Sequence, residues 1–303
     1  MGIYSIKNKK QLFLPILSFA ILSALISGGN LFGGGKFPIS WAPDKIEKDQ
    51  FIGTSQVINA TFKSAKELEN VKFWFTPRLS KYSRVEPETI AKIEKDKEYN
   101  ISIIVSIPSD FKIRKHEKDD FKDSLKSYLG QDFGEKEYNR DLKNQEEFFK
   151  EFHPDKIRGL LFVAEEKQTK WPNFIKQKRT VRKIYPLPLR IAINVKKATT
   201  QDTIEPFEID SDPTKVVVSE GVKFLVNEIV ILLKDEAKLV DAIQIAGLVD
   251  GVITGFIPQP QIYKIEISTA TAAELNNKIQ IIKNSNNPLI IEVVQNLIGE
   301  PIK

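Results

Sequence analysis

The stretch from Glu220 to Asn296 constrains the fold more than any other part of this 303-residue chain. It alternates short runs of β-branched and apolar residues with segments in which apolar residues recur at helical spacing. The runs that predict strands are 228–233, 252–257, 262–267 and 289–294. The order strand–helix–strand–strand–helix–strand is that of a split β-α-β unit, an antiparallel sheet with two helices on one face. The sequence therefore predicts an α+β, ferredoxin-like (βαββαβ) domain here.

The two predicted helices have different signals. The first spans 235–248 on apolar periodicity alone. The second begins at Thr271, which forms a capping box with Glu274 three residues later, and it stops at 284–287. Its apolar stripe consists of Leu275, Ile279 and Ile282. Because both helices cover one face of the sheet, the other face must either be polar or dock on a partner.

Five segments of this stretch occur in a characteristic order: Glu228–Lys234, Ala246–Ile253, Phe256–Pro258, Ile262–Ile265 and Asn287–Asn296. Together they resemble the prodomain of subtilisin-type serine proteases (subtilases), most closely the fervidolysin-like branch. The resemblance covers roughly the last quarter of the chain and implies an inhibitor and folding chaperone of a subtilase. Many unrelated ferredoxin-like domains share the same element order, so that alternative stays open.

The resemblance also implies a role for the C-terminal end of the chain. In the family, the prodomain sheet rests on the enzyme while the end of the prodomain occupies the substrate groove. We expect the last strand to end near Val294 and to leave a free tail that an extended groove can bind through its backbone. The alternative is a frayed terminus without a role. The predicted protease-binding tail consists of Val294, Gln295, Asn296, Leu297 and Ile298, with Leu297 or Ile298 as pocket fillers.

Residues 37–196 show the two-residue alternation of strands, which predicts an all-β sandwich. The clearest runs are 56–62, 71–75, 99–107, 159–163 and 187–195. The segments Asn59–Phe62, Leu68–Val71, Tyr99–Ile101 and Pro186–Leu189 resemble immunoglobulin-like modules of bacterial surface proteins. The fold class expected for the whole chain is thus multidomain, with an immunoglobulin-like sandwich before the α+β domain.

A densely charged insertion interrupts the sandwich at about 110–158. Its apolar residues fall into two clusters that predict two amphipathic helices. These clusters are Leu125 with Leu129, and Phe148 with Phe149 and Phe152. The insertion is interpreted as a helical excursion lying on the sandwich, with a dedicated partner surface as the alternative.

Lys and Arg residues dominate Lys167–Lys183, interleaved with Trp171 and Phe174. Such a mixture occurs in nucleic-acid-binding proteins. A long hairpin between two strands of an exported domain explains it more simply, and an anionic cell-wall polymer or lipid surface is the intermediate interpretation. The formal net charge of +5 is spread along the chain, so we expect no nucleic-acid partner.

The N-terminus carries a basic run at Lys7–Lys10 followed by about 15 mostly apolar residues at Leu12–Ile26. A spanning helix needs roughly 20 such residues, which favours a cleaved signal peptide over a permanent anchor. The expected organisation is therefore an export segment with a Gly-rich spacer (1–36), the sandwich (37–196), a linker (197–218) and the prodomain-like domain (219–303). The expected location is extracellular or in the cell envelope, with membrane attachment through the N-terminal segment as an open alternative.

The sequence contains no constellation that predicts catalysis, a metal site or a cofactor. It has no Cys, and its two histidines, His116 and His153, both lie in the charged insertion. The segment Gly53–Gln56 superficially resembles the subtilase serine motif, but it precedes both histidines, whereas the triad order in that family is Asp, His, Ser. We expect a protein that is not an enzyme. Two function hypotheses remain: a regulator of a subtilisin-like serine protease, and a structural or adhesive surface protein with an immunoglobulin-like binding module.

Overall fold

The computed structural model of the protein describes residues 38–111, 156–170, 178–185, 187–219 and 221–298. Every described residue belongs to one compact unit, Phe37–Lys303. The predicted export segment and the insertion helices predicted at Leu125, Leu129, Phe148, Phe149 and Phe152 lie outside the described residues. Within the described ranges, no helix has both the length and the apolar character needed to cross a membrane.

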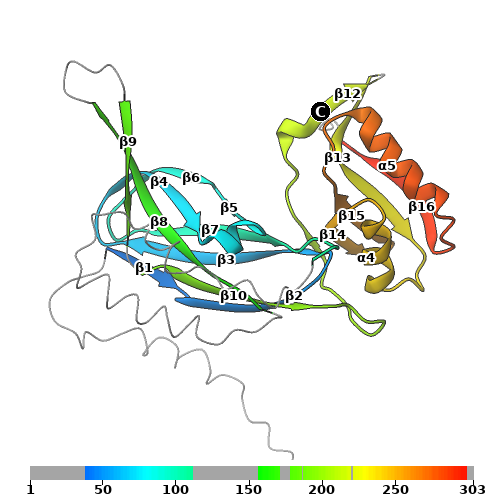
Figure 1. Cartoon of the computed structure of the whole chain (residues 1–303), viewed down its shortest axis with the longest axis horizontal. Helices are drawn as coiled ribbons and strands as arrows, with labels where there is room; N and C mark the ends of the chain where they lie inside the picture. Colours follow the sequence, from blue (N-terminus) through cyan, green and yellow to red (C-terminus); the bar gives the residue numbers. More distant parts are fainter. Residues whose placement is uncertain (1–37, 112–155, 171–177, 186, 220, 299–303) are drawn as a thin grey trace, which may run out of the picture. The chain divides into compact units, whose positions relative to one another are not determined.

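Two sheets form the N-terminal part, as the alternation predicts (Figure 1). The first has the strand order β1-β3-β7-β5, and the second has the order β2-β10-β8-β4-β6 with β9 added to β8. Neighbouring strands are antiparallel except β2 and β10, which are parallel. The first sheet comprises β1 (Ile39–Ala42), β3 (Ser55–Ser64), β5 (Ser83–Glu86) and β7 (Glu98–Ser106). The second comprises β2 (Lys45–Phe51), β4 (Leu68–Phe75), β6 (Thr89–Ile93), β8 (Lys156–Lys170), β9 (Lys178–Ile184) and β10 (Leu189–Lys196).

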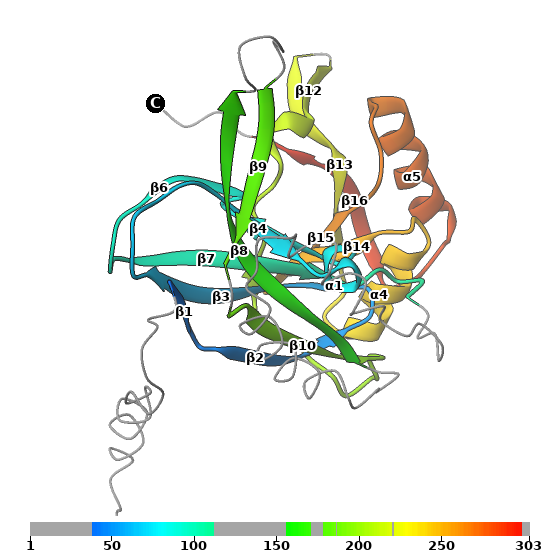
Figure 2. The ribbon, with the colours of Figure 1, turned by 60° about the vertical axis from the view of Figure 1, so that its left-hand side comes forward.

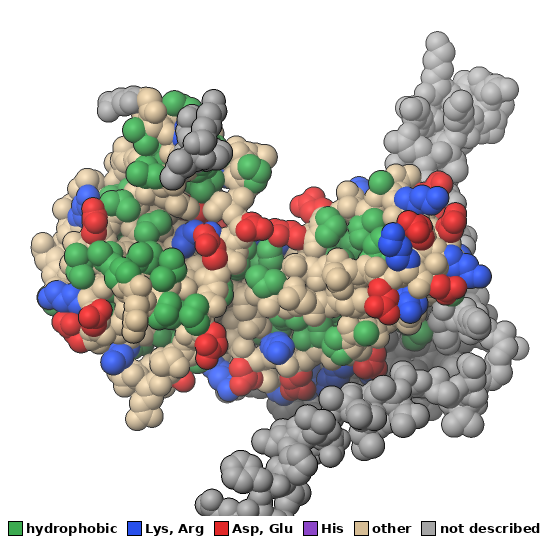
Figure 3. Space-filling view, turned by 180° about the vertical axis from the view of Figure 1, so that it is seen from behind, with side chains coloured by type: hydrophobic (Ala, Val, Ile, Leu, Met, Phe, Trp, Pro, Cys, Tyr) green, Lys and Arg blue, Asp and Glu red, His purple; other side chains and the backbone are tan. Residues whose placement is uncertain are grey.

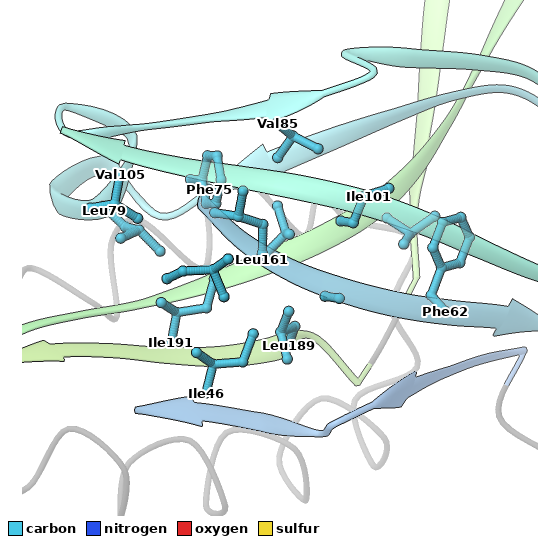
Figure 4. Packing of buried hydrophobic residues seen from close by; sticks show 14 of the residues in the cluster. Ile46, Phe62, Phe75, Leu79, Val85, Ile101, Val105, Leu161, Leu189 and Ile191 are labelled. Atoms are coloured by element: carbon cyan, nitrogen blue, oxygen red, sulfur yellow. The ribbon is translucent and has the colours of Figure 1, made fainter. Parts of the chain in front are cut away.

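One hydrophobic core lies between these two sheets, which makes this part a β-sandwich (Figure 4). Alternate residues of each strand point into it because successive side chains of a strand point to opposite faces. The short helix α1 (Pro77–Ser80) also packs here, where a Cβ on Gly159 would lie 2.4 Å from that of Leu79. The core residues labelled in Figure 4 include Ile46, Phe62, Phe75, Ile101, Leu161 and Ile191.

Strands β8 and β9 form the long hairpin that the sequence predicts. Strand β8 pairs with β4 only as far as Glu165, and with β9 from Ala164 to Lys170. Beyond residue 165 the two strands therefore continue as a two-stranded ribbon, which extends past the rest of the sandwich in both views (Figures 1 and 2).

A third sheet forms the C-terminal part, with the strand order β11-β14-β15-β13-β12 and with β16 paired to β13. All of its paired strands are antiparallel. Its strands are β11 (Phe207–Glu208), β12 (Val216–Ser219), β13 (Val222–Leu233), β14 (Val252–Pro258), β15 (Gln261–Glu266) and β16 (Ile290–Leu297). The four strands predicted from the sequence thus lie side by side in the order β14-β15-β13-β16.

Two helices, α4 (Leu239–Gly247) and α5 (Ala272–Asn284), pack against this sheet around a second hydrophobic core. The predicted capping box of α5 is confirmed: Thr271 Oγ1 accepts from the Glu274 N–H at 3.2 Å, and Glu274 Oε2 accepts from the Thr271 N–H at 3.2 Å. The predicted stripe of α5 is also the buried one. Helix α4 begins at Leu239 instead of residue 235, because the Asp241 carboxylate accepts from the Lys238 N–H and fixes the first turn there.

The segment 197–218, which the sequence predicts to be a linker, contributes structure to this sheet. It supplies β11, the 3₁₀-helix η1 (Pro213–Lys215) and β12. Ile204 and Phe207 pack against the second core, and the Ile209 N–H donates to the Thr254 carbonyl oxygen at 2.9 Å. The segment therefore has more contacts than its polar, Pro-containing sequence indicates. The boundaries at 196 and 219 stay predictions.

Candidate functional site

The face of the C-terminal sheet opposite its helices carries an apolar patch. Leu232, Ile262 and Ile257 lie in register across β13, β15 and β14. On the neighbouring strand pair, Val230 lies opposite Val294 of β16. Their neighbours along the strands, Ile231, Tyr263 and Val293, belong to the core that the helices cover. Because successive side chains of a strand point to opposite faces, the first set of residues points away from the helices. We define the open-face patch as Val230, Leu232, Ile257, Ile262 and Val294.

The open-face patch is accessible to a partner. Ile257 is 50% exposed and Val294 is 37% exposed, while Val230, Leu232 and Ile262 are half-buried. Figure 3 shows hydrophobic side chains gathered on the C-terminal part in the view from behind, with charged side chains scattered around them. The sequence left open whether this face is polar or apolar, and the structure shows a mixed face: the five apolar side chains form one patch, and the exposed Glu292 lies opposite Leu232 at its edge. Apolar side chains on an unpaired sheet face are typical of a protein-binding surface.

A buried polar network borders the patch. Lys264 lies on the same face and is 6% exposed. Its Nζ donates to Glu208 Oε1 at 3.0 Å, to the Ile209 carbonyl oxygen, and to Ser211 Oγ at 3.4 Å. The segment 207–211 therefore covers one side of the face and satisfies a lysine that would otherwise be a buried, unpaired charge.

The network continues through Glu228, which is 3% exposed. Its Oε2 accepts from Ser211 Oγ at 2.9 Å and from Asn296 Nδ2 at 2.6 Å. The carboxylate thus connects the segment 207–211 to the last strand. Sequence reasoning predicted a strand at 262–267 and missed this network. The signal that indicates it is a pair of charged residues, Glu228 and Lys264, inside otherwise apolar strands.

The predicted protease-binding tail is largely part of β16. The strand runs to Leu297 instead of ending near Val294, and Leu297 lies opposite Phe224 of β13. Gln295 Nε2 donates to Asn276 Oδ1 at 2.8 Å, and the Ile298 N–H donates to the Lys223 carbonyl oxygen at 2.9 Å. The free end predicted to start at Gln295 is therefore wrong, because β13 is long enough to pair with these residues. Residues 299–303 lie outside the described residues.

Strand β16 nevertheless presents groups to a partner. Among the described strands it pairs only with β13, so its second edge carries unpaired backbone N–H and C=O groups. Leu297 is 60% exposed and Ile298 is 37% exposed, so the two predicted pocket fillers have accessible side chains. Val294 belongs to the open-face patch as well. The five predicted tail residues thus lie next to the patch, held in place by β13.

The described residues bring together no catalytic constellation. Ser55 Oγ lies 2.7 Å from Ser106 Oγ of the paired strand β7, and Thr54 Oγ1 donates to the Phe51 carbonyl oxygen, so these hydroxyls form structural hydrogen bonds at the start of β3. His116 and His153 lie outside the described residues. In the described part of the chain, no cluster of His, Cys, Asp and Glu side chains could hold a metal ion. Burial, followed by the nearby Asp241 charge, raises the pKa of Tyr263 to about 12, so its phenol stays neutral.

No family model matches the sequence, and no curated protein matches it. Among solved structures, one that is similar over 52% of this chain is a family 123 glycoside hydrolase from Clostridium perfringens, described in a study of glycolipid glycan hydrolysis. The match has a TM-score of 0.26 and 10% sequence identity, and it spans 23% of that chain.

Proposed function

We propose that this is an exported, non-catalytic protein whose C-terminal domain binds a subtilisin-like serine protease as an inhibitor or folding chaperone. The observation that carries the proposal is the open-face patch with β16 beside it. A docked enzyme surface would cover the five apolar side chains of the patch, and the exposed edge of β16 would remain available to an extended groove. The segments that resemble subtilase prodomains include at least half of β13 and most of β14, β15 and β16, the strands that build this face.

The proposal includes finer fold assignments. The strand order β14-β15-β13-β16 with α4 and α5 supports a ferredoxin-like fold for the C-terminal domain, with β11 and β12 as additions. Two sheets of mostly antiparallel strands around one core support an immunoglobulin-like sandwich for the N-terminal part. In this proposal the sandwich presents the inhibitory domain and takes no part in chemistry.

Binding would use apolar burial more than charge. Each patch residue is aliphatic, and full burial of such a side chain contributes about 1.5–3 kcal/mol. The half-buried members contribute less because part of their surface is already covered. Ile257 is the most exposed of the five, so it offers the largest single gain. The buried Lys264 and Glu228 already have hydrogen-bond partners, so their charges need none from the enzyme, whereas the exposed Glu292 opposite Leu232 would lie at the rim of the interface.

A matched pair of variants tests the proposal. Ile257→Glu places a charge on the open-face patch, whereas Ile281→Glu places one on α5, which covers the other face of the sheet. The two residues are similarly exposed, at 50% and 46%. We expect the purified wild-type protein to inhibit a panel of subtilisin-like proteases. Ile257→Glu should weaken inhibition by about tenfold or more, the loss expected for burying an unpaired charge, and Ile281→Glu should inhibit like wild type.

The outcomes separate the proposal from its alternative. Equal inhibition by both variants would exclude the open-face patch as the docking surface. Absence of inhibition by the folded wild-type protein, across the panel, would favour the structural or adhesive surface protein. Circular dichroism and the thermal midpoint of each variant establish that it is folded before its inhibition is measured.

A further inference from the structure

The first sheet of the sandwich carries two Asn-x-Ser/Thr sequences that lie side by side. They are Asn59-Ala60-Thr61 on β3 and Asn100-Ile101-Ser102 on β7. No other asparagine of the sequence has Ser or Thr two positions later. Strands β3 and β7 are the two inner strands of this sheet, so segments that are distant in the sequence place both of these motifs at its centre.

The strand register places each asparagine opposite the hydroxyl residue of the other motif. Asn59 pairs with Ser102, and Thr61 pairs with Asn100. Ser102 Oγ donates to Asn59 Oδ1 at 3.1 Å, and Thr61 Oγ1 donates to Asn100 Oδ1 at 2.8 Å. Neither asparagine Nδ2 has a hydrogen-bond partner among the described residues. Each side chain is therefore held through its oxygen and leaves its amide nitrogen available.

The two asparagine side chains are open to solvent. The residues between the motif positions, Ala60 and Ile101, belong to the sandwich core. Because successive side chains of a strand point to opposite faces, Asn59 and Asn100 point away from that core. Both are exposed, and so is Ala42 on the neighbouring strand β1. A bulky group on either amide nitrogen therefore has room.

Asparagine is not the residue that the sheet itself favours at these positions. Asn is depleted in strands, whereas Val, Ile and Thr are enriched. The cross-strand hydrogen bonds stabilise the sheet, but two facing Thr residues would form such a bond with better strand formers. A local choice that disagrees with the fold is typical of a functional position.

We propose that Asn59 and Asn100 are acceptors of N-linked glycans, which are added while the chain is exported. The inference rests on the export that is part of the proposed function, and it is independent of protease binding. Asn-x-Ser/Thr, with any residue except Pro in the middle, is the acceptor motif of exported proteins. Ala60 and Ile101 both meet that condition.

The donor of the glycan is a lipid-linked oligosaccharide pyrophosphate, and the transfer is catalysed by a membrane oligosaccharyltransferase. The asparagine Nδ2 attacks the anomeric carbon of the first sugar and forms the new carbon–nitrogen bond. The bond from that carbon to the pyrophosphate oxygen breaks, and the lipid pyrophosphate leaves. The amide loses one proton, and nothing is oxidised or reduced.

The fold accommodates the product. A glycosylated asparagine keeps its Oδ1 and one N–H, so the hydrogen bonds from Ser102 and Thr61 persist. Asn59 and Asn100 are diagonal neighbours across the strand pair, which places them about 7–8 Å apart. Two glycans can therefore leave the same face side by side.

The folded sheet, by contrast, is a poor substrate for the transfer. Strand β3 is paired with β1 and β7, and β7 is paired with β3 and β5, so neither motif has a free backbone edge. The hydroxyl that each motif requires is engaged by the asparagine of the other. The transfer must therefore precede the pairing of β3 with β7.

The test measures the mass of the full-length protein made by the organism that encodes it, after cell fractionation. Tandem mass spectrometry of its peptides locates the modified residues. Asn59→Gln removes one acceptor, Thr61→Val removes only the required hydroxyl, and Thr61→Ser keeps the motif. Asn277→Gln is the matched control, because Asn277 is exposed on α5 and lies outside either motif.

We expect the exported protein to carry two glycans, one at Asn59 and one at Asn100. Asn59→Gln and Thr61→Val should each carry one, and Thr61→Ser and Asn277→Gln should carry two. An unmodified asparagine in the exported protein would overturn the inference at that position and leave export intact. Protein found only inside the cell would overturn both export and the inference.

A second measurement tests the order of events. The full-length chain is synthesised in a cell-free system, either with membranes that contain the transferase and its lipid-linked donor or with these membranes added after folding. We expect glycosylation only when the membranes are present during synthesis. Equal glycosylation of the folded chain would overturn the conclusion that the transfer precedes sheet formation.

Discussion

Replacing Lys264 by Met tests whether the buried polar network holds the segment 207–211 against the C-terminal sheet. Methionine keeps the length and apolar stem of lysine but removes its three donors. The change deletes the bonds to Glu208, to the Ile209 carbonyl oxygen and to Ser211. Breaking a buried ion pair costs about 3–5 kcal/mol when the remaining charge stays buried. Here the Glu208 side chain is 69% exposed and can regain water, which lowers the cost.

Two further bonds limit the loss. The Ile209 N–H still donates to the Thr254 carbonyl oxygen, and Ser211 still donates to Glu228. We therefore expect Lys264→Met to lower the free energy of unfolding by about 1.5–3 kcal/mol, the range for hydrogen bonds to charged groups. Urea unfolding followed by circular dichroism measures it. Limited proteolysis should in addition cut faster between residues 198 and 215 in the variant, because 207–211 is released.

The control is Lys278→Met. Lys278 pairs with Asp250 at 3.3 Å, but the Asp250 side chain is 87% exposed. The variant should therefore lower the free energy of unfolding by less than about 1 kcal/mol. The reasoning would be refuted if both variants unfolded at the same urea concentration. It would also be refuted if Lys264→Met left the rate of proteolysis between 198 and 215 unchanged.

Three further changes have expected outcomes. Thr271→Ala should lower stability by about 1 kcal/mol through loss of the α5 cap, and an unchanged urea midpoint would contradict that role. Hydrogen bonds from the Ala270 N–H and then from Thr271 hold the pKa of the Glu274 carboxyl below its usual 4.5. The ionised Glu274 carboxylate therefore stabilises the fold above pH 4.5, and this stabilisation is lost as the pH falls through the lowered pKa. Glu274→Gln should therefore flatten the loss of stability in acid, and an unaltered acid profile would argue against it. A chain that ends at Ile298 should still inhibit the protease, whereas a chain that ends at Val294 should not, because β16 is then shortened. Inhibition by the shorter chain would show that β16 beyond Val294 is dispensable.

The parts of the fold that could be predicted are those in which local signals agree. In α5, the capping box and the apolar stripe both indicate the same helix, and the structure places its start where the box does. The alternation along β3 and β7 indicates strands with one buried face, and that face lines the sandwich core. In each case the residue pattern within one element is sufficient.

The parts that could not be predicted depend on contacts between distant segments. The burial of Lys264 results from residues 207–211, more than 50 positions earlier in the chain. The extension of β16 to Leu297 depends on the start of β13, since a strand continues as far as its partner offers hydrogen bonds. Residues 207–209 have no strand pattern of their own, so only the free edge of β14 determines β11. The candidate site was predictable as an uncovered sheet face, but its apolar character and polar border were not.

The most direct test of the protease-binding proposal is a titration of a subtilisin-like protease with the purified full-length protein, followed by hydrolysis of a small chromogenic peptide. The account predicts saturable inhibition that reaches completion at about one molecule per active enzyme and that persists on prolonged incubation. Rapid cleavage of the protein by the protease, with activity toward the chromogenic peptide unchanged throughout, would contradict it.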